Sequence, residues 1–299
     1  MLGNLQKIVQ CAGENTAKSV REQLTKFGVA KDIDDETLKE VGEKPELPVR
    51  PPVLCAGCPH RASFYAVKQA MKEKEAVFCG DIGCYTLGNA KPLDMTDTCL
   101  CMGADVTIAQ GLHRIEPEKV HFSFIGDSTF FASGITGVVN AVYNETDIVL
   151  IVLDNSTTAM TGHQPHPGTG VTMMDMVKKK DTNPKDEITH KISIEAVLKA
   201  VGVVSVEKVN PFELDKAIDA VKRAAQMKGV KAIIFKSPCI AVNKPKKAYT
   251  VSEKCIKCKK CINEIGCPAV TNIDGKIEID SSLCFGCGLC KSYLSGSCY

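Results

Sequence analysis

The hydrophobic pattern in the middle of the chain predicts a strand, a turn, a helix and a second strand. Residues 122–125 and 148–153 are short apolar runs, and the second is rich in β-branched side chains. Such runs are typical of strands that are buried on both faces of a parallel sheet. Residues 132–143, which lie between them, are small and apolar and indicate a helix. Both strands of such a unit end at the same sheet edge, where these folds bind ligands.

The same alternation extends over most of the chain and predicts an α/β domain whose parallel sheet is covered on both faces. The further elements expected from the pattern are helices at 61–72, 103–113, 193–201 and 211–227, and strands at 76–79, 120–125, 203–207 and 230–236. The loop after residue 155 is long and ends in several glycines and prolines. Long loops of this kind within a compact domain are usually functional.

The chain divides into three segments by composition. Residues 1–52 contain a helical pattern at 4–27, a polar stretch at 32–46 that favours a short helix, and a proline-rich linker. Because this segment is too small to hold a core, we expect it to be the tail of a missing upstream domain. Residues 53–242 form the main domain, and residues 243–299 form a small cysteine-rich domain that begins with a basic linker.

Composition argues against several classes of protein. The 299 residues carry a formal charge of +2, so there is no basic footprint for nucleic acid. No apolar run approaches about 18 residues, so we expect no membrane span. The first residues lack the apolar core of a signal peptide, and we expect a cytoplasmic protein. The sequence contains 16 cysteines, which without export are expected to bind metals rather than form disulfides.

Oxygen-bearing side chains follow the two central strands. Asp127 follows the first strand and Asn155 follows the second. Their oxygen atoms suit a hard cation such as Mg²⁺, which proteins often share with substrate phosphates. The start of the helix after Ser128 offers free backbone N–H groups to a phosphate, so the pattern predicts a metal–diphosphate site. An ordinary strand–helix–strand unit, in which these side chains only cap turns, is the alternative.

This stretch resembles the thiamine diphosphate motif, in which GDG is followed some two dozen residues later by NN. The matching residues are Gly126, Asp127, Ser128, Asp154 and Asn155, so serine replaces the second glycine and aspartate replaces the first asparagine. The resemblance implies that these residues bind thiamine diphosphate. It also implies that Asp127, the side chain of Asn155 and the backbone carbonyl of Thr157 hold Mg²⁺.

The last segment carries two cysteine triplets with C-x2-C-x2-C spacing. Three thiolates at this spacing hold one [4Fe–4S] cluster, and the fourth ligand comes from the other run. We therefore assign four cysteines to each of two clusters: Cys255, Cys258, Cys261 and Cys298 to one, and Cys267, Cys284, Cys287 and Cys290 to the other. The segment resembles the bacterial two-cluster ferredoxins, although its spacers before Cys267 and Cys298 are longer, and an Asp-Gly pair predicts a hairpin within it. A zinc module is the alternative, but zinc sites favour paired cysteines.

A second cysteine set lies in loops at predicted strand ends: Cys55, Cys58, Cys84 and Cys239. These thiols could converge on one sheet edge and hold a third cluster, or each could be a small buried side chain. Three histidines are candidates for catalysis: His60, His163 and His166. Loop histidines near a cofactor can line a substrate pocket or move protons, and solvated loop histidines are the equal alternative.

Taken together, these motifs resemble one family. The stretches that carry the resemblance are LCAGCPHR (54–61), GDIGCYTLG (80–88), CLCMGA (99–104), IGDSTFFASGITG (125–137), LDNSTTAMTGHQPHPG (153–168), SPC (237–239) and the ferredoxin-like tail. With them the chain is similar to the C-terminal half of the large subunit of the indolepyruvate:ferredoxin oxidoreductases, within the 2-oxoacid:ferredoxin oxidoreductases. The pyruvate branch holds a proximal cluster through a CxGC pair, a later GC and a distant cysteine. Cys55, Cys58, Cys84 and Cys239 match that pattern.

The resemblance implies oxidation of aryl pyruvates with coenzyme A to aryl-acetyl-CoA, carbon dioxide and reduced ferredoxin. It implies as partners the small (beta) subunit, an external ferredoxin, and a chain or segment that supplies the pyrimidine-binding domain with its activating glutamate. We expect the chain to be inactive without that domain. Three alternatives stay open: a 2-oxoacid of the pyruvate type, an electron-transfer protein whose front domain is a scaffold, and non-oxidative decarboxylation with structural clusters.

Overall fold

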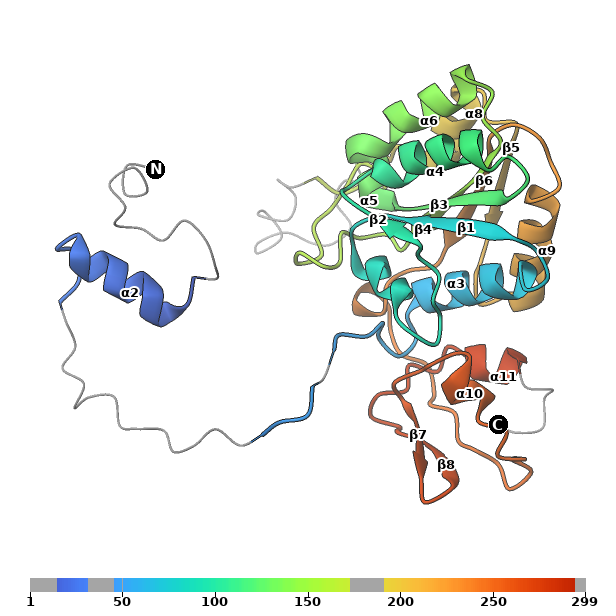
Figure 1. The fold of residues 1–299 in the computed structure, drawn as a ribbon. Helices are drawn as coiled ribbons and strands as arrows, with labels where there is room; N and C mark the ends of the chain where they lie inside the picture. Colours follow the sequence, from blue (N-terminus) through green and yellow to red (C-terminus); the bar gives the residue numbers. More distant parts are fainter. Residues whose placement is uncertain (1–14, 32–45, 50, 173–190, 294–299) are drawn as a thin grey trace. The chain divides into compact units, whose positions relative to one another are not determined.

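The computed structural model of this protein describes residues 15–31, 46–49, 51–172 and 191–293 (Figure 1). Contacts divide the chain into two compact units, Met1–Pro51 and Pro52–Tyr299. The short helix expected over 32–46 lies outside the described residues, apart from its last position. Among the described residues, no helix is long and apolar enough to cross a bilayer.

The first unit contains helix α2 (Ala17–Lys26), within the range that its apolar pattern predicts. A capping box starts the helix: Thr16 Oγ1 accepts a hydrogen bond from the Ser19 backbone N–H, and Ser19 Oγ accepts one from the Thr16 N–H. Such caps satisfy backbone donors that the first turn leaves free. No residue of α2 is buried, and the apolar Val20 and Leu24 stay about two-fifths exposed.

The second unit is built on six parallel strands in the order β2-β1-β3-β4-β6-β5, which confirms the predicted α/β architecture. The strands are β1 (Ala76–Gly80), β2 (Thr98–Cys99), β3 (Val120–Gly126), β4 (Ile148–Asp154), β5 (Ser205–Val209) and β6 (Lys231–Lys236). The prediction missed β2, a two-residue edge strand. It also placed β5 two residues early, because the Val203 N–H bonds back to Leu198 O at the end of the preceding helix.

Helices cover both faces of the sheet (Figure 1). They are α3 (Pro59–Ala70), α4 (Ala104–Ile115), α6 (Ile135–Tyr143), α8 (Ile194–Ala200) and α9 (Leu214–Ala224). Apolar side chains of α3 and α9 form one core with the sheet, and those of α4, α6 and α8 form another. Within β4, Val149 and Ile151 face the first core while Leu150 and Val152 face the second. Burial on both faces explains why this strand is apolar at every position.

The helix after β3 starts earlier than predicted. Helix α5 (Asp127–Thr129) begins directly at the strand end and continues through a π-helical turn, η3 (Phe130–Gly134), into α6. The prediction began this helix at residue 132, where the run of small residues starts, although aromatic residues such as Phe130 and Phe131 are more typical of strands. Burial of Phe130 in the core beneath α6 outweighs that preference.

The cysteine-rich tail contains the predicted hairpin. Strands β7 (Val270–Ile273) and β8 (Lys276–Ile279) pair antiparallel. The turn residues Asp274 and Gly275 both have positive φ, at 49° and 80°, as a two-residue turn that follows strand twist requires. Short helices α10 (Lys260–Asn263) and α11 (Leu289–Tyr293) flank the hairpin.

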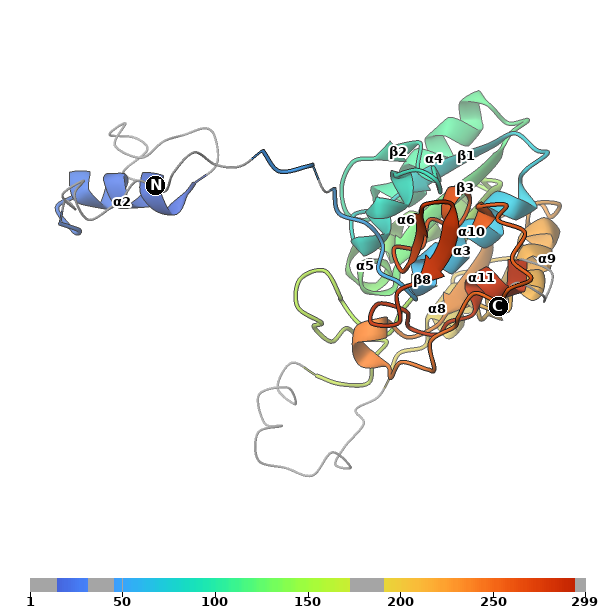
Figure 2. The ribbon, with the colours of Figure 1, turned by 90° about the horizontal axis from the view of Figure 1, so that it is seen from below.

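The tail lies against the α3 face of the sheet, as both views show (Figure 2). Ile265 and Leu289 are buried in the same core as α3 and β4. The tail has in addition a small cluster of its own around Cys261, Val270 and Ile277. So few apolar side chains contribute little stability, and the tail therefore depends on its contacts with the main domain.

Truncation of a central strand residue tests this architecture. Ile151 is fully buried in the middle of β4, so we expect Ile151→Ala to lower the free energy of unfolding by about 2–5 kcal/mol. Val139 on α6 is 46% exposed, and Val139→Ala should change it by less than about 0.5 kcal/mol. Urea unfolding followed by circular dichroism measures both, and equal effects would contradict this burial pattern.

Candidate functional site

The ends of β3 and β4 bring the predicted metal ligands to one sheet edge. The two strands are neighbours, and Gly126 pairs with Leu153 in register. Asp127 and Asn155 follow directly on these strands, and both are almost completely buried. The parallel pairing therefore places a carboxylate and an amide side chain at adjacent strand ends, as the sequence predicts.

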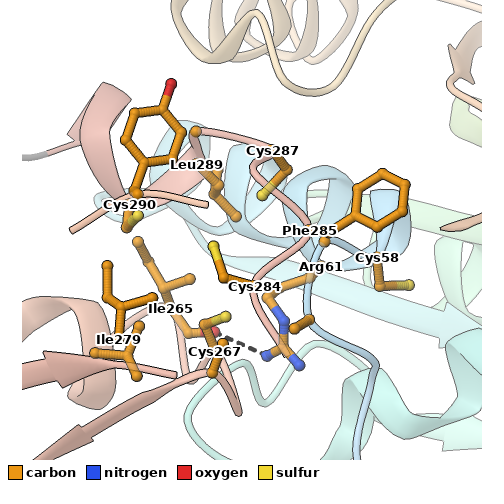
Figure 3. A pocket seen from close by; sticks show the side chains of 16 residues that line it. Cys58, Arg61, Ile265, Cys267, Ile279, Cys284, Phe285, Cys287, Leu289 and Cys290 are labelled. Atoms are coloured by element: carbon orange, nitrogen blue, oxygen red, sulfur yellow. Dashed lines mark hydrogen bonds between the residues drawn. The ribbon is translucent and has the colours of Figure 1, made fainter. Parts of the chain in front are cut away.

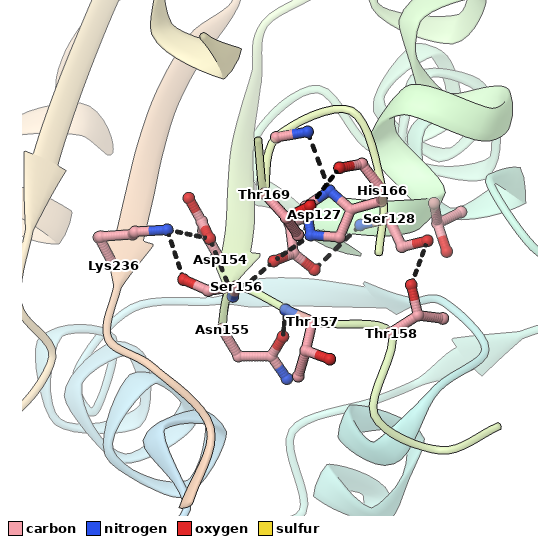
Figure 4. Close-up of polar contacts among 12 residues, drawn as sticks. Asp127, Ser128, Asp154, Asn155, Ser156, Thr157, Thr158, His166, Thr169 and Lys236 are labelled. Atoms are coloured by element: carbon pink, nitrogen blue, oxygen red, sulfur yellow. Dashed lines mark hydrogen bonds and ion pairs between the residues drawn. The ribbon is translucent and has the colours of Figure 1, made fainter. Parts of the chain in front are cut away.

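Backbone N–H groups and a histidine hold the Asp127 carboxylate (Figure 4). Its Oδ1 accepts a hydrogen bond from the Ser128 N–H at 2.9 Å, and its Oδ2 accepts one from the Ser156 N–H at 2.8 Å. His166 Nε2 lies 3.1 Å from the same Oδ2, but it is not aligned for a good hydrogen bond. Burial raises the pKa of Asp127, and the neighbouring His166 lowers it in part.

The orientation of His166 follows from its other nitrogen. The Gly168 N–H donates to His166 Nδ1 at 3.2 Å, so the proton of a neutral ring belongs on Nε2, next to Asp127. The ring also stacks on Phe131, with centroids 6.0 Å apart. A histidine held in this way can orient a neighbouring carboxylate without itself contacting a metal ion that the carboxylate binds.

Asn155 is fixed by two contacts. Its Oδ1 accepts a hydrogen bond from the Thr157 N–H at 3.2 Å. Its amide nitrogen therefore faces His60 Nε2, at 3.1 Å. His60 is buried, and burial lowers its pKa to about 4, so the ring is neutral at neutral pH and can accept this hydrogen bond. The candidate His60 thus reaches the site from the first turn of α3.

Asp154 is part of an ion pair. It pairs in register with Lys236 on β6, and Lys236 Nζ donates to Asp154 Oδ1 at 2.6 Å and to Ser156 Oγ at 2.8 Å. The thiamine motif has asparagine at position 154. The lysine on the adjacent strand accounts for the aspartate here, since it neutralises the extra charge and orients the loop that follows β4.

A cavity of about 110 Å³ opens between these strand ends. Its walls include His60, Tyr85, Asp127, Asn155 and Met160, together with part of the loop after β4. Of the three candidate histidines, His60 lines the cavity and His166 touches Asp127. His163 is exposed, has a φ of 63° and does not line the cavity.

Sequence reasoning missed Tyr85 as part of this site. Tyr85 lies in the 3₁₀-helix η2 (Cys84–Asn89), and its hydroxyl donates to Asp81 Oδ2 at 2.7 Å. A Cβ atom at Gly126 would lie 2.4 Å from that hydroxyl oxygen. The glycine at the end of β3 therefore leaves room for the tyrosine. The signal available in the sequence was that Tyr85 belongs to the stretch GDIGCYTLG.

The second cysteine set surrounds the same edge of the sheet. Cys84 lines the cavity, and the Cys239 N–H donates to Asn155 O at 2.9 Å. Burial raises the pKa of Cys84, and the electrostatic influence of Cys239 and Cys55 raises it further. Cys58 ends the same loop as Cys55, and burial raises its pKa to about 12.

The tail brings together the four cysteines assigned to the second of its clusters. Cys267, Cys284, Cys287 and Cys290 line one small cavity (Figure 3). After burial, the mutual negative charge of Cys287, Cys267 and Cys284 raises the pKa of Cys290, to about 12 in all. Of the other set, Cys261 is buried, Cys255 is partly buried and Cys258 is exposed. Cys298 lies outside the described residues.

The described cysteines are all free thiols rather than disulfides. Within the described ranges, no three histidine, cysteine, aspartate or glutamate side chains form a group that could hold a metal ion. A site at Asp127, Asn155 and Thr157 would depend instead on one carboxylate together with an amide oxygen and a backbone oxygen. The donor set at these strand ends, consisting of one carboxylate, one amide oxygen and one carbonyl, fits Mg²⁺ by its chemistry.

Comparison with known proteins places these features in context. The family "Thiamine pyrophosphate enzyme, C-terminal TPP binding domain" matches residues 81–235. This range includes β3, β4 and the strand-end residues of the site.

Two curated relatives resemble most of the chain. It is 44% identical over 253 residues to the indolepyruvate oxidoreductase subunit IorA of Archaeoglobus fulgidus, covering 82% of this chain and 39% of the relative. It is 36% identical over 304 residues to the subunit of the same name from Thermococcus kodakarensis, covering 93% and 45%. These matches confirm the resemblance to the indolepyruvate oxidoreductases, and the chain spans less than half the length of these relatives.

A solved structure shares the fold. The structure of 2-oxoglutarate:ferredoxin oxidoreductase from Magnetococcus marinus, with 2-oxoglutarate, coenzyme A and succinyl-CoA bound, superposes with a TM-score of 0.52 at 18% identity. The match covers 66% of this chain and 67% of the other.

The contact between Gly126 and Tyr85 can be tested by adding one methyl group. We expect Gly126→Ala to lower the free energy of unfolding by about 1–3 kcal/mol, because the new Cβ displaces Tyr85 from Asp81. Gly111, on α4, is the matched control: a Cβ there meets nothing within 4 Å. Gly111→Ala should be neutral or stabilise by up to about 1 kcal/mol, and the same loss in both variants would show that the Tyr85 contact is unimportant.

Proposed function

The chain belongs to the thiamine pyrophosphate enzymes and contains their C-terminal TPP-binding domain, and we propose that it is the cofactor-binding and iron–sulfur module of a 2-oxoacid:ferredoxin oxidoreductase. The substrates we propose are aryl pyruvates such as indolepyruvate, which are oxidatively decarboxylated with coenzyme A to aryl-acetyl-CoA, carbon dioxide and reduced ferredoxin. Identity of 36–44% with indolepyruvate oxidoreductase subunits supports this substrate class.

The observation that carries the proposal is the buried pair of Asp127 and Asn155 at adjoining strand ends. Together with the backbone carbonyl of Thr157, these residues would hold Mg²⁺, and the helix start at Asp127 would receive the diphosphate. Thiamine diphosphate supplies a nucleophilic carbon for the 2-oxoacid carbonyl and takes up the electrons that decarboxylation leaves.

The histidines have different positions and therefore different roles. His166 would limit where the Asp127 carboxylate can point, because its Nε2 lies 3.1 Å from that carboxylate. His60 is neutral and buried, lines the cavity and accepts from Asn155, so it would orient the amide oxygen toward the metal. His163 lies on the exposed part of the loop, from which it could meet substrate only through a change in the loop.

The cysteines supply the route for electrons. We propose two [4Fe–4S] clusters in the tail and a third at Cys55, Cys58, Cys84 and Cys239. In a [4Fe–4S] cluster each iron atom is bound by one thiolate, so the four cysteine ligands lie farther apart than the ligands of a single metal ion. The third set borders the cofactor cavity, through Cys84 and through the bond between Cys239 and Asn155 O, which suits a first electron acceptor.

The partners that we propose follow from the share of the relatives that this chain covers. It spans 39–45% of the two subunits described above. A further chain or segment would supply the pyrimidine-binding domain, besides the small (beta) subunit and an external ferredoxin. Oxidation of another 2-oxoacid is the nearest alternative, because the walls of the cavity do not identify an aryl group. An electron-transfer protein with a non-catalytic front domain would lack cofactor binding altogether.

Cofactor binding tests the proposal against the electron-transfer alternative. We expect the purified chain to bind thiamine diphosphate only with Mg²⁺, and Asp127→Asn to weaken binding by about tenfold to a hundredfold or more, because it removes a charged metal ligand. Isothermal titration calorimetry measures this. Asp219→Asn is the matched control: it is the same change on the exposed face of α9, away from the residues that line the cavity, and should leave binding within about threefold of the wild type. Absence of Mg²⁺-dependent binding in the wild type would refute the site.

Iron analysis tests the cluster assignment. Protein purified without oxygen should contain about twelve iron atoms per chain, four for each cluster. Cys239→Ser should remove about four of them, whereas Cys79→Ser should remove none, because Cys79 is buried in β1 outside the three sets. About eight iron atoms in the wild type would confine the clusters to the tail and refute the third one.

A further inference from the structure

Arg61 is a buried cation at the junction between the main domain and the tail. It is the third residue of α3 and is only 4% exposed. Its Nη1 donates to Ile265 O at 2.9 Å and to Gly266 O at 2.7 Å, and its Nη2 donates to Leu54 O (Figure 3). The guanidinium group therefore joins the loop before α3 to the tail residues that directly precede Cys267.

The hydrogen-bond partners of this guanidinium are all neutral. They are backbone carbonyls, Arg61 Nε has no partner, and the ion pairs found in the described residues do not include Arg61. A buried charge without a counter-ion is strongly unfavourable, and carbonyl dipoles offset only part of that cost. Negative charge close to Arg61 would account for the rest.

Cysteines from two sets surround the same cavity as Arg61. This small cavity is lined by Cys58 from one set and by Cys267, Cys284, Cys287 and Cys290 from the other. Once such cysteines bind a cluster, their thiolates bring negative charge to the side of the guanidinium.

The two cysteine loops also touch each other. A Cβ atom at Gly57, between Cys55 and Cys58, would lie 2.4 Å from the Cβ of Phe285, which follows Cys284. The Phe285 carbonyl is in turn fixed by the Lys246 N–H at 3.0 Å. The contact leaves Arg61 enclosed where the CAGC loop meets the second cysteine triplet.

We propose that Arg61 is the shared counter-ion of two iron–sulfur sites, the one at Cys55, Cys58, Cys84 and Cys239 and the one at Cys267, Cys284, Cys287 and Cys290. This proposal rests on the proposed function, which assigns clusters to these cysteines. A cluster bound by four thiolates carries net negative charge and gains one more on reduction. A fixed positive charge between two such clusters favours the reduced form of each, and so raises both reduction potentials.

The proposal is distinct from a purely mechanical role. If Arg61 only attached the tail to the main domain, its three carbonyl contacts would matter and its charge would not. Lysine keeps the charge but loses the forked geometry in which Nη1 donates to Ile265 O and Gly266 O while Nη2 donates to Leu54 O. Methionine removes both the charge and the hydrogen bonds while keeping a long apolar side chain. Arg61→Lys and Arg61→Met therefore separate the two roles.

Lys68 provides a matched control on the same helix. Its Nζ donates to two backbone carbonyls, Pro92 O at 2.7 Å and Leu93 O at 2.6 Å. It is thus a partly buried cation held by carbonyls, two turns beyond Arg61, but it lines neither cysteine cavity. Lys68→Met removes a comparable charge without approaching the clusters.

The experiment is a redox titration of the chain, followed by electron paramagnetic resonance after iron analysis. We expect Arg61→Met to lower the potentials of two clusters while the third changes less, Arg61→Lys to keep both near the wild type, and Lys68→Met to change none. Unchanged potentials in an iron-replete Arg61→Met protein would overturn the proposal.

Two further outcomes distinguish failure of the counter-ion role from failure of the cluster assignment. If Arg61→Met does not retain iron, Arg61→Lys decides: wild-type potentials support the counter-ion role. Iron loss in Arg61→Lys as well, together with faster amide hydrogen exchange over residues 255–293, indicates docking alone and overturns the counter-ion role. Wild-type protein with no more than about eight iron atoms would instead refute the third cluster of the proposed function, and this inference with it.

Discussion

The parallel pairing of β3 with β4 is the constraint on which the site depends. Because Gly126 lies opposite Leu153, the chain leaves the sheet at neighbouring points with Asp127 on one strand and Asn155 on the other. Both residues are buried, and each is held by backbone N–H groups of the loop after β4 or of the first helical turn. The hydrogen bonds of the backbone thus orient the polar atoms before any ligand arrives.

The first turn of α3 links this site to the tail. Two consecutive residues leave it in different directions: His60 contacts Asn155, and Arg61 contacts the carbonyls that precede Cys267. Successive side chains on a helix are separated by about 100° of rotation, so adjacent residues can serve different neighbours.

Much of the fold could be predicted from the sequence, because its signals are local. Strands buried on both faces must be apolar at every position, which made β3 and β4 recognisable, and the Asp-Gly pair at 274–275 adopts the two positive φ angles that its hairpin requires. Errors arose where a longer-range interaction competes with local preference. Burial of Phe130 pulls the helix start forward to Asp127, and the bond from the Val203 N–H to Leu198 O delays β5.

By itself, the sequence determined the chemistry available to this protein: the strand-end oxygens, the spacing of the cysteines and the α/β rhythm. All of these depend on residues close together in the chain. Only the tertiary structure decided which distant side chains meet. It paired Lys236 with Asp154, set Tyr85 against Gly126, placed His166 rather than His163 beside Asp127, and enclosed Arg61 between two cysteine sets. The reason is that such contacts arise from strand order and from the fit of one layer on another, which no local pattern of residues encodes.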